Sequence, residues 1–206
     1  MATRIRSRSS MMRKQPQQAR SRATIDAVLE AAAHILGQRR WRGLTTNAVA
    51  QAAGVSIGSL YQYFPNKLAL VEAVRQRHFD EVLAVLGTAA DQNLARPRRV
   101  AALVEGMIGV HGRYPAAHRV LLEEVPRGDD ARPRHDRFAR ILQQRYEAIV
   151  AGHAGPISEE RRRVVAHVLS SALAGVVHDA AGRGTLHSDS LRRELMALVD
   201  SYLSAK

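Results

Sequence analysis

A short segment between residues 45 and 63 places capping and small residues where two short helices would begin and end. Thr45 and Ser56 are typical N-cap residues, because a side-chain oxygen there accepts a hydrogen bond from a free backbone N–H. Gly54 can take the left-handed conformation that ends a helix. Two helices joined by so tight a turn cross steeply, and the small Ala50 lets their backbones approach. The second helix is then free to enter a groove.

An amphipathic helix is predicted before this segment. Its apolar residues recur at intervals of three and four, which places one stripe along a helix that we expect to end near Gly37. The stripe consists of Ile25, Val28, Leu29, Ala32, Ala33 and Leu36. One amphipathic helix followed by two short helices is the order expected of a helix-turn-helix domain. We expect Leu60 of the last helix to pack into the core.

This pattern resembles the DNA-binding signature of the tetracycline-repressor (TetR) family over residues 22 to 75. The resemblance is carried by Thr45-Thr46, Val49-Ala50, Ala53-Gly54-Val55-Ser56, Gly58-Ser59-Leu60-Tyr61, Tyr63-Phe64 and Lys67. It implies a sequence-specific transcription regulator, by default a repressor that a small-molecule effector releases from operator DNA. The remaining two thirds resemble the family only in being helical.

The resemblance also implies a set of DNA-contacting residues. These are Thr46, Asn47, Ser56, Ile57, Gly58, Ser59, Tyr61, Tyr63 and Lys67. The hydroxyls of Thr46 and Tyr61 and the charge of Lys67 suit phosphates. At the start of the second helix, an apolar group can meet a thymine methyl, a glycine permits close approach and a hydroxyl can bond a base edge. The alternative is that Thr46 and Ser56 only cap helices and that Tyr61 packs.

Charge along the chain favours the same partner. Residues 1 to 67 hold eleven Lys or Arg against two acids, whereas residues 68 to 206 hold twenty against seventeen. This concentration of positive charge in the first third of the chain favours a polyanionic partner. A solvated basic tail would show the same excess of charge. We interpret residues 1–20 as a basic flexible arm, which enters a minor groove or remains a plain tail. Trp41 is expected to pack, with Arg39, Arg40 and Arg42 available to phosphates.

The rest of the chain predicts an all-α protein of about nine helices, because apolar stripes of helical period follow one another without strand alternation. Proline residues at 97, 115, 133 and 156 mark helix starts. The expected organisation is an arm at 1–20, a three-helix DNA-binding domain at 21–66 and a helical effector-binding and dimerisation domain at 67–206.

The family resemblance implies that the last two helices, at about 158–181 and 188–203, form a homodimer interface, and that the preceding helices enclose an effector pocket. Candidate pocket residues are Met107, His111, Leu122, Phe138, Leu142, Tyr146 and His178. Each of them also suits a plain core position. Few aromatics and several histidines favour an apolar or amphipathic effector of modest size.

Several function classes find no support in the sequence. The chain has no cysteine, and His111, His118, His135, His153 and His167 lack paired metal-ligand spacing, so we expect no metal and no cofactor. There is no phosphate-binding loop, nucleophile elbow or zinc-protease motif, which disfavours an enzyme. No apolar run predicts a membrane span, so we expect a cytoplasmic protein. An architectural DNA-binding protein without effector and a protein-interaction module remain alternatives.

Overall fold

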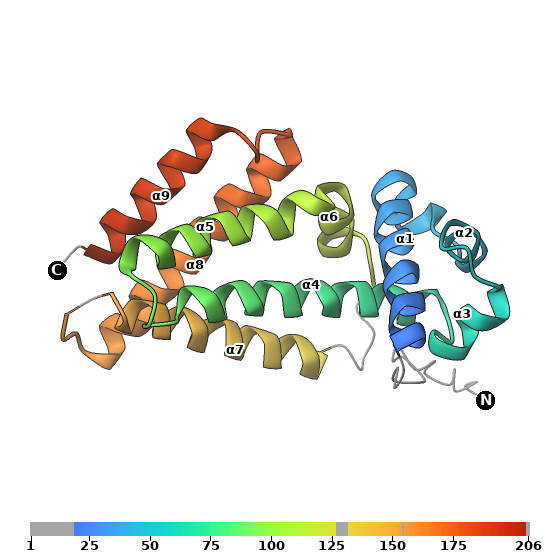
Figure 1. Ribbon diagram of the computed structural model, residues 1–206, viewed down its shortest axis with the longest axis horizontal. Coiled ribbons are helices and arrows are strands. Elements are labelled where there is room, and N and C mark those ends of the chain that lie inside the picture. Colours follow the sequence, from blue (N-terminus) through green and yellow to red (C-terminus); the bar gives the residue numbers. More distant parts are fainter. Residues whose placement is uncertain (1–18, 127–131, 154, 205–206) are drawn as a thin grey trace, which may run out of the picture. The chain divides into compact units, whose positions relative to one another are not determined.

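The computed structural model describes residues 19–126, 132–153 and 155–204. Within them every regular element is an α-helix (Figure 1), so the all-α prediction with about nine helices is confirmed. The helices are α1 (Ala19–Gly43), α2 (Thr46–Ala52), α3 (Ile57–Tyr63), α4 (Lys67–Ala89), α5 (Arg96–Arg113), α6 (Pro115–Glu123), α7 (Arg132–Ala151), α8 (Glu159–Arg183) and α9 (Asp189–Ser204). Residues 1–18 of the predicted basic arm lie outside the described residues.

Helix boundaries follow local chemistry. The hydroxyl of Ser158 accepts a hydrogen bond from the backbone N–H of Arg161 at 3.2 Å, which caps α8. The same helix ends at Gly184, whose φ of 72° is left-handed. It therefore runs slightly past the expected end at 181. Helix α7 begins at Arg132, so Pro133 lies in its first turn as predicted, where no backbone N–H is needed.

The chain forms two compact units, which differ from the domains predicted at 21–66 and 67–206. The first unit comprises the chain up to Arg77 together with 116–135, and the second comprises 78–115 and 136–206. The start of α4 and most of α6 thus belong with the helix-turn-helix. Each unit is described separately below.

The first unit has a core built by α1, α3 and the start of α4. Leu36, Phe64 and Leu70 are fully buried there, and Leu60 is 1% exposed. The predicted stripe of α1 is confirmed, because all six of its members are buried. Figure 1 shows α2 and α3 joined by a short turn beside α1. The segment formed by α2, the turn and α3 therefore packs on a buried apolar core.

The prediction that α1 ends near Gly37 is wrong. The helix continues to Gly43, with a break at Arg40, where φ is 57° and ψ is −177°. Gly37 instead serves a close helix approach, since a Cβ on it would lie 3.2 Å from the backbone nitrogen of Ala117 in α6. A glycine that ends a helix and one that admits a neighbouring helix look alike in sequence.

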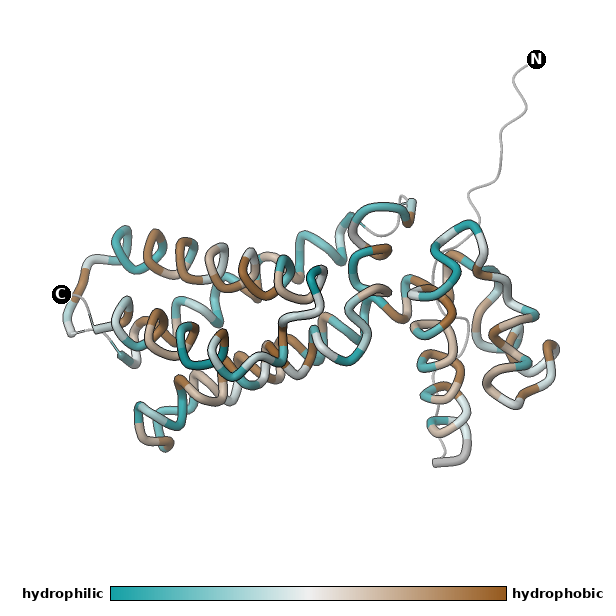
Figure 2. Tube along the Cα trace, turned by 90° about the horizontal axis from the view of Figure 1, so that it is seen from above, coloured by the Kyte–Doolittle hydropathy of each residue, from teal (hydrophilic) through white to brown (hydrophobic). Residues whose placement is uncertain are grey.

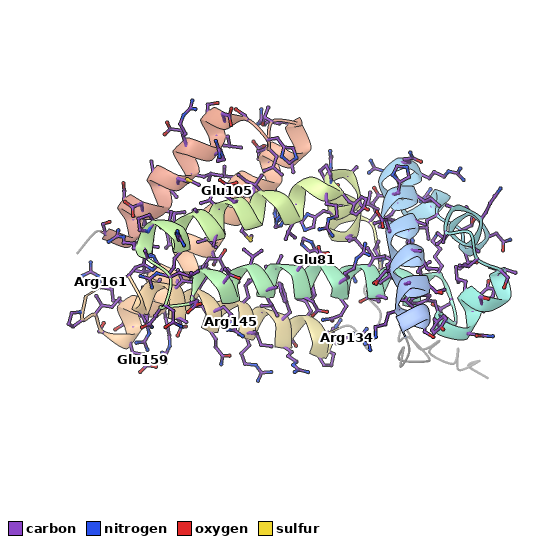
Figure 3. All side chains as sticks on the ribbon, viewed as in Figure 1. Glu81, Glu105, Arg134, Arg145, Glu159 and Arg161 are labelled. Atoms are coloured by element: carbon purple, nitrogen blue, oxygen red, sulfur yellow. The ribbon has the colours of Figure 1, made fainter. Side chains whose placement is uncertain are left out.

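The second unit packs helices from its two chain segments around one apolar core. Leu86, Leu103, Leu169 and Val199 are buried in it, with Tyr146 among them. Figure 2 shows apolar and polar residues alternating along the helical turns, as expected when each helix buries one face. Ion pairs tie the helix surfaces together. Glu81 pairs with Arg113 at 2.9 Å, and Glu105 pairs with Arg192 at 3.1 Å; Figure 3 labels both glutamates.

Candidate functional site

The turn between α2 and α3 is built by its own side chains. The Thr45 hydroxyl accepts a hydrogen bond from the N–H of Ala48 at 3.2 Å, and the Ser56 hydroxyl accepts one from the N–H of Ser59 at 3.0 Å. Gly54 has a φ of +66° and so makes the left-handed turn. The predicted caps and turn residue are confirmed. Because both caps lie within the motif, the angle between the two helices is fixed locally.

Helix α3 buries one face and exposes the other. Leu60 points into the core, whereas Ile57 is 38% exposed and Tyr61 is 42% exposed. A large aliphatic and a large aromatic side chain on this face are therefore accessible to a partner. The hydroxyls of Thr46 and Tyr61 hydrogen-bond each other at 3.0 Å, which joins the start of α2 to this exposed face.

The remaining predicted contact residues of the motif differ in exposure. Asn47 and Gly58 are exposed, whereas Ser59 and Tyr63 are half-buried. The hydroxyls of Ser56 and Ser59 hydrogen-bond each other at 2.8 Å. A Cβ at Gly58 would meet only the Ser56 hydroxyl, at 3.8 Å, which is ordinary contact. The fold itself therefore does not require a glycine at this position.

Lys67 has partners that the sequence did not predict. Its Nζ donates a hydrogen bond to the backbone oxygen of Trp41 and lies 4.0 Å from the centre of the Trp41 ring. Burial lowers the pKa of Lys67. The ammonium group of Lys67, expected to be available to a phosphate, instead contacts Trp41 near the end of α1. Trp41 is half-buried and packs, as expected.

The basic cluster beside Trp41 is also partly engaged. Arg40 forms an ion pair with Glu124, and the other carboxylate oxygen of Glu124 accepts a hydrogen bond from the Trp41 N–H at 3.3 Å. Arg39 and Arg42 are exposed. Of the three arginines expected to be available to phosphates, Arg40 is therefore committed to the fold, because Glu124 anchors the break in α1.

A buried charged group stabilises the frame beneath the motif. Glu72 is 7% exposed and pairs with Arg75 and, at 3.7 Å, with Arg134. Arg75 also donates to the backbone oxygen of Leu121 at 3.0 Å. Buried charges are tolerated only when paired and hydrogen-bonded in this way. The group joins α4, α6 and α7 within the first unit.

Two family models match the chain. Residues 28–74 match the model of bacterial regulatory proteins of the tetR family, and residues 97–203 match the model of the tetracyclin repressor-like C-terminal domain. The chain belongs to the TetR family. This confirms the predicted helix-turn-helix DNA-binding fold with a helical C-terminal region, and it makes the protein a transcription regulator.

Known relatives agree with this placement. The HTH-type transcriptional activator FasR of Mycolicibacterium smegmatis is 30% identical over 96 residues, which are 47% of this chain and 44% of FasR. The solved SmeT–triclosan complex matches with a TM-score of 0.66 and 20% identity, over 88% of this chain and 90% of SmeT. NalD of Pseudomonas aeruginosa is the secondary repressor of the MexAB-OprM multidrug efflux pump. Its structure matches with a TM-score of 0.63 and 18% identity, over 88% of this chain and 97% of NalD.

In this TetR-family chain, some predicted pocket residues lie inside the apolar core of the second unit, and others are partly buried at its edge. Tyr146 is 1% exposed and Met107 is 4% exposed, both inside the core of the second unit. Phe138 and Leu142 are partly buried and pack against that core. The side chain of Leu122 lies outside the described residues. Burial raises the pKa of Tyr146, so its phenol stays protonated at neutral pH.

Aromatic and imidazole rings gather beside these residues. Phe79 stacks on Phe138 with ring centres 3.8 Å apart. The rings of His78 and His178 each lie 5.0 Å from the ring of His111, measured between centres. Burial lowers the pKa of His78 to about 3 and that of His111 to about 4, with the neighbouring imidazoles adding to the shift. His78 and Phe79 were not predicted as pocket residues, because nothing in their local spacing distinguishes them.

Proposed function

We propose that the protein is a homodimeric repressor that binds operator DNA through α3 and is released by a small apolar or amphipathic effector held in the second unit. The observation that carries the proposal is the exposed face of α3, where the side chains of Ile57 and Tyr61 are accessible to solvent while Leu60 anchors the capped helix in the core. The regulator acts in the cytoplasm and without catalysis. It contacts the chromosome directly.

Side chains on this face have distinct roles in the proposed complex. Ile57 meets a thymine methyl, and Gly58 allows the backbone of α3 to approach the bases. The hydroxyl pair of Thr46 and Tyr61 donates to a phosphate, which positions the helix without reading sequence. Ser59 reaches a base edge when its bond to Ser56 exchanges. Further contacts come from Asn47, Tyr63 and Lys67, the last after leaving Trp41.

Helices α8 and α9 supply the dimer interface. Large apolar side chains remain exposed on them: Val164 is 57% exposed, Val168 42% and Val176 36% on α8, and Leu198 is 43% exposed on α9. On α8 these valines share a face with the exposed, small Ala172 and Gly175. A second copy of the same face can pack against it closely, because small residues let two helices approach. Burying such valines contributes about 25 cal/mol per Å².

The same face explains another property of α8. By length and composition, α8 is apolar enough to cross a membrane, yet only 28% of its apolar window is buried within the chain. A core helix would bury far more of that window. Covering by a second subunit accounts for both observations, and it fits a family whose regulators are soluble.

The effector class follows from the ring-lined core of the second unit. The stacked Phe79 and Phe138 offer an apolar aromatic surface, and Tyr146 offers a protonated phenol. SmeT has been solved with triclosan, a small aromatic compound, which supports an effector of this kind. Repression is favoured because a dimer seated on a promoter occludes polymerase, and NalD is a repressor. FasR is an activator, so activation is the alternative sign.

The effector proposal is tested by a thermal-shift screen of small aromatic compounds, with triclosan as the first probe. A compound that raises the melting temperature should lower operator affinity by about 5- to 150-fold, because coupling between two sites is usually about 1–3 kcal/mol. The Phe138→Leu variant should lose much of this response while its ligand-free DNA affinity stays unchanged. Tyr202→Phe is the matched control. Ligands that bind without changing DNA affinity would favour the architectural alternative.

A further inference from the structure

The exposed face of α3 extends beyond Ile57 and Tyr61. Gly58 and Gln62 are exposed as well, whereas Leu60 is buried. Successive residues of an α-helix are turned by about 100°, so the exposed positions form one continuous arc of the helix surface. Gln62 lies one turn after Gly58, and residues four apart on a helix share a face. Its side chain therefore belongs to the surface that is proposed to face DNA.

The amide of Gln62 differs from the hydroxyls of the motif in having no partner. Tyr61 hydrogen-bonds Thr46 at 3.0 Å, and Ser59 hydrogen-bonds Ser56 at 2.8 Å. Within the described part of the chain, Gln62 takes part in no hydrogen bond and no ion pair. Its carboxamide is therefore available to a base edge without breaking a bond inside the protein.

The chemistry of this amide selects one base. Helix α3 contains no arginine or lysine, and Gln62 is its one side chain with an N–H donor and a carbonyl acceptor in one plane. Adenine presents the complementary pair in the major groove, with the N7 acceptor beside the N6 donor. Guanine presents two acceptors, N7 and O6, so one of them would face the amide oxygen. A glutamine at this place therefore favours adenine.

The length of α3 lets its last turn take part in base contacts. Its seven residues span about 10 Å at 1.5 Å per residue, which is less than the roughly 12 Å width of the major groove. One turn before Gln62, a Cβ on Gly58 would meet only the Ser56 hydroxyl, at 3.8 Å. The helix surface beside the amide is therefore open to a base edge.

We propose that Gln62 is a specificity-determining residue, which binds an adenine in each operator half-site through paired hydrogen bonds to N6 and N7. The inference rests on the proposed binding of operator DNA through α3. It adds to that proposal a defined feature of the operator: each half-site holds an A·T pair at the position of Gln62, besides the thymine that meets Ile57.

The test begins with selection of bound DNA from a random duplex library by the full-length chain and by Gln62→Ala. The unaltered protein should enrich a half-site with one fixed adenine. In Gln62→Ala the preference for that adenine should fall by about 5- to 150-fold, the factor that corresponds to one bidentate contact. Affinity for random DNA should stay the same, because phosphate contacts carry it. Gln144→Ala, at an exposed glutamine of α7, is the matched control.

A modified base then identifies the atoms in contact. Replacing the fixed adenine by 7-deazaadenine removes the N7 acceptor, which should weaken binding by the unaltered protein and leave Gln62→Ala unaffected. Gln62→Arg should move the preference at this position to guanine, because a guanidinium donates to both O6 and N7. Circular dichroism checks that the variants fold, as expected for changes at an exposed helix position. An equal loss with 7-deazaadenine in both proteins would assign the contact to another residue.

The outcomes separate this inference from the proposed function. An enriched inverted repeat whose adenine preference persists in Gln62→Ala would overturn the role of Gln62 and leave the repressor standing. Loss of that preference in Asn47→Ala alone would assign it to the exposed amide of α2 instead. An equal loss of affinity for all sequences in Gln62→Ala would make Gln62 a phosphate contact and would also overturn the inference. No enrichment by the unaltered protein would contradict both.

Discussion

The two units hold their chemistry-bearing side chains in opposite ways. In the first unit, the residues proposed to contact DNA lie close together in the chain, mostly on α2 and α3, are exposed or half-buried, and stand beside caps in the same segment. In the second unit, the rings come from α4, α5, α7 and α8; His111 is buried, and His78, Phe79, Phe138 and His178 are half-buried. A surface that reads DNA needs local rigidity, whereas a pocket is assembled by tertiary packing. Mutations at the exposed face of α3 should therefore separate function from stability, whereas mutations of the half-buried and buried rings of the second unit should couple them.

The largest effect is expected from breaking the proposed dimer. Val168→Arg places a charge on the exposed face of α8, so the monomer should still fold. A monomer has only one α3 to place on the operator. Its operator affinity should be lower by at least about 100-fold, because binding through two linked sites typically raises affinity 10²–10⁴-fold over one site. Sedimentation velocity and mobility shift check this. Ala148→Arg, on the exposed surface of α7, is the control; a Val168→Arg protein that stays dimeric would place the interface elsewhere.

A smaller effect should follow from Gly58→Ala. The added methyl meets only the Ser56 hydroxyl at 3.8 Å, so the fold accommodates it and gains about 0.5–1 kcal/mol from the helical alanine. If α3 approaches the bases at Gly58, the methyl should cost roughly 1–3 kcal/mol of operator binding. Gly109→Ala on α5 makes the same exchange with nothing within 4 Å. Equal DNA affinity in the two variants would remove Gly58 from the interface.

The smallest effect concerns pH in the second unit. The folded-state pKa values of His78 and His111, about 3 and about 4, lie below the ordinary value of 6.5. The unfolded chain therefore binds more protons below pH 6.5, and stability falls as pH drops, by at most about 1.4 kcal/mol per pH unit for each imidazole that stays neutral in the folded chain. Urea unfolding at pH 7 and pH 5 should show this loss. His111→Gln should reduce the slope; an unchanged slope would refute the buried neutral state.

Sequence reasoning worked where the physics is local. Thr45, Gly54 and Ser56 reveal helix ends, because capping and left-handed turns depend on the residue itself. The end of α1 was predicted wrongly, since Gly37 serves contact with α6 and not termination. The hydrogen bond from Lys67 to Trp41 was also missed, because it depends on how the end of α1 packs against the start of α4.

Residues of the second unit were less predictable. Met107, Phe138 and Tyr146 follow apolar helical spacing, so their burial was foreseeable, but a core position and a pocket position have the same pattern. His78 shares no helix with His111 or His178, and rules for ligand spacing within one helix cannot detect such a cluster. The unit boundary within α4 likewise follows from packing of α6, which no composition change marks.

Selection of bound DNA from a random duplex library tests the central claim most directly. The full-length protein should enrich an inverted repeat whose half-site centres lie about one helical turn apart, roughly 34–36 Å, or a multiple of it. Gly58→Ala should lose that enrichment while keeping its fold and its dimer. Enrichment of a single asymmetric half-site bound by a monomer, or no enrichment above random sequence, would contradict a dimeric reader built on α3.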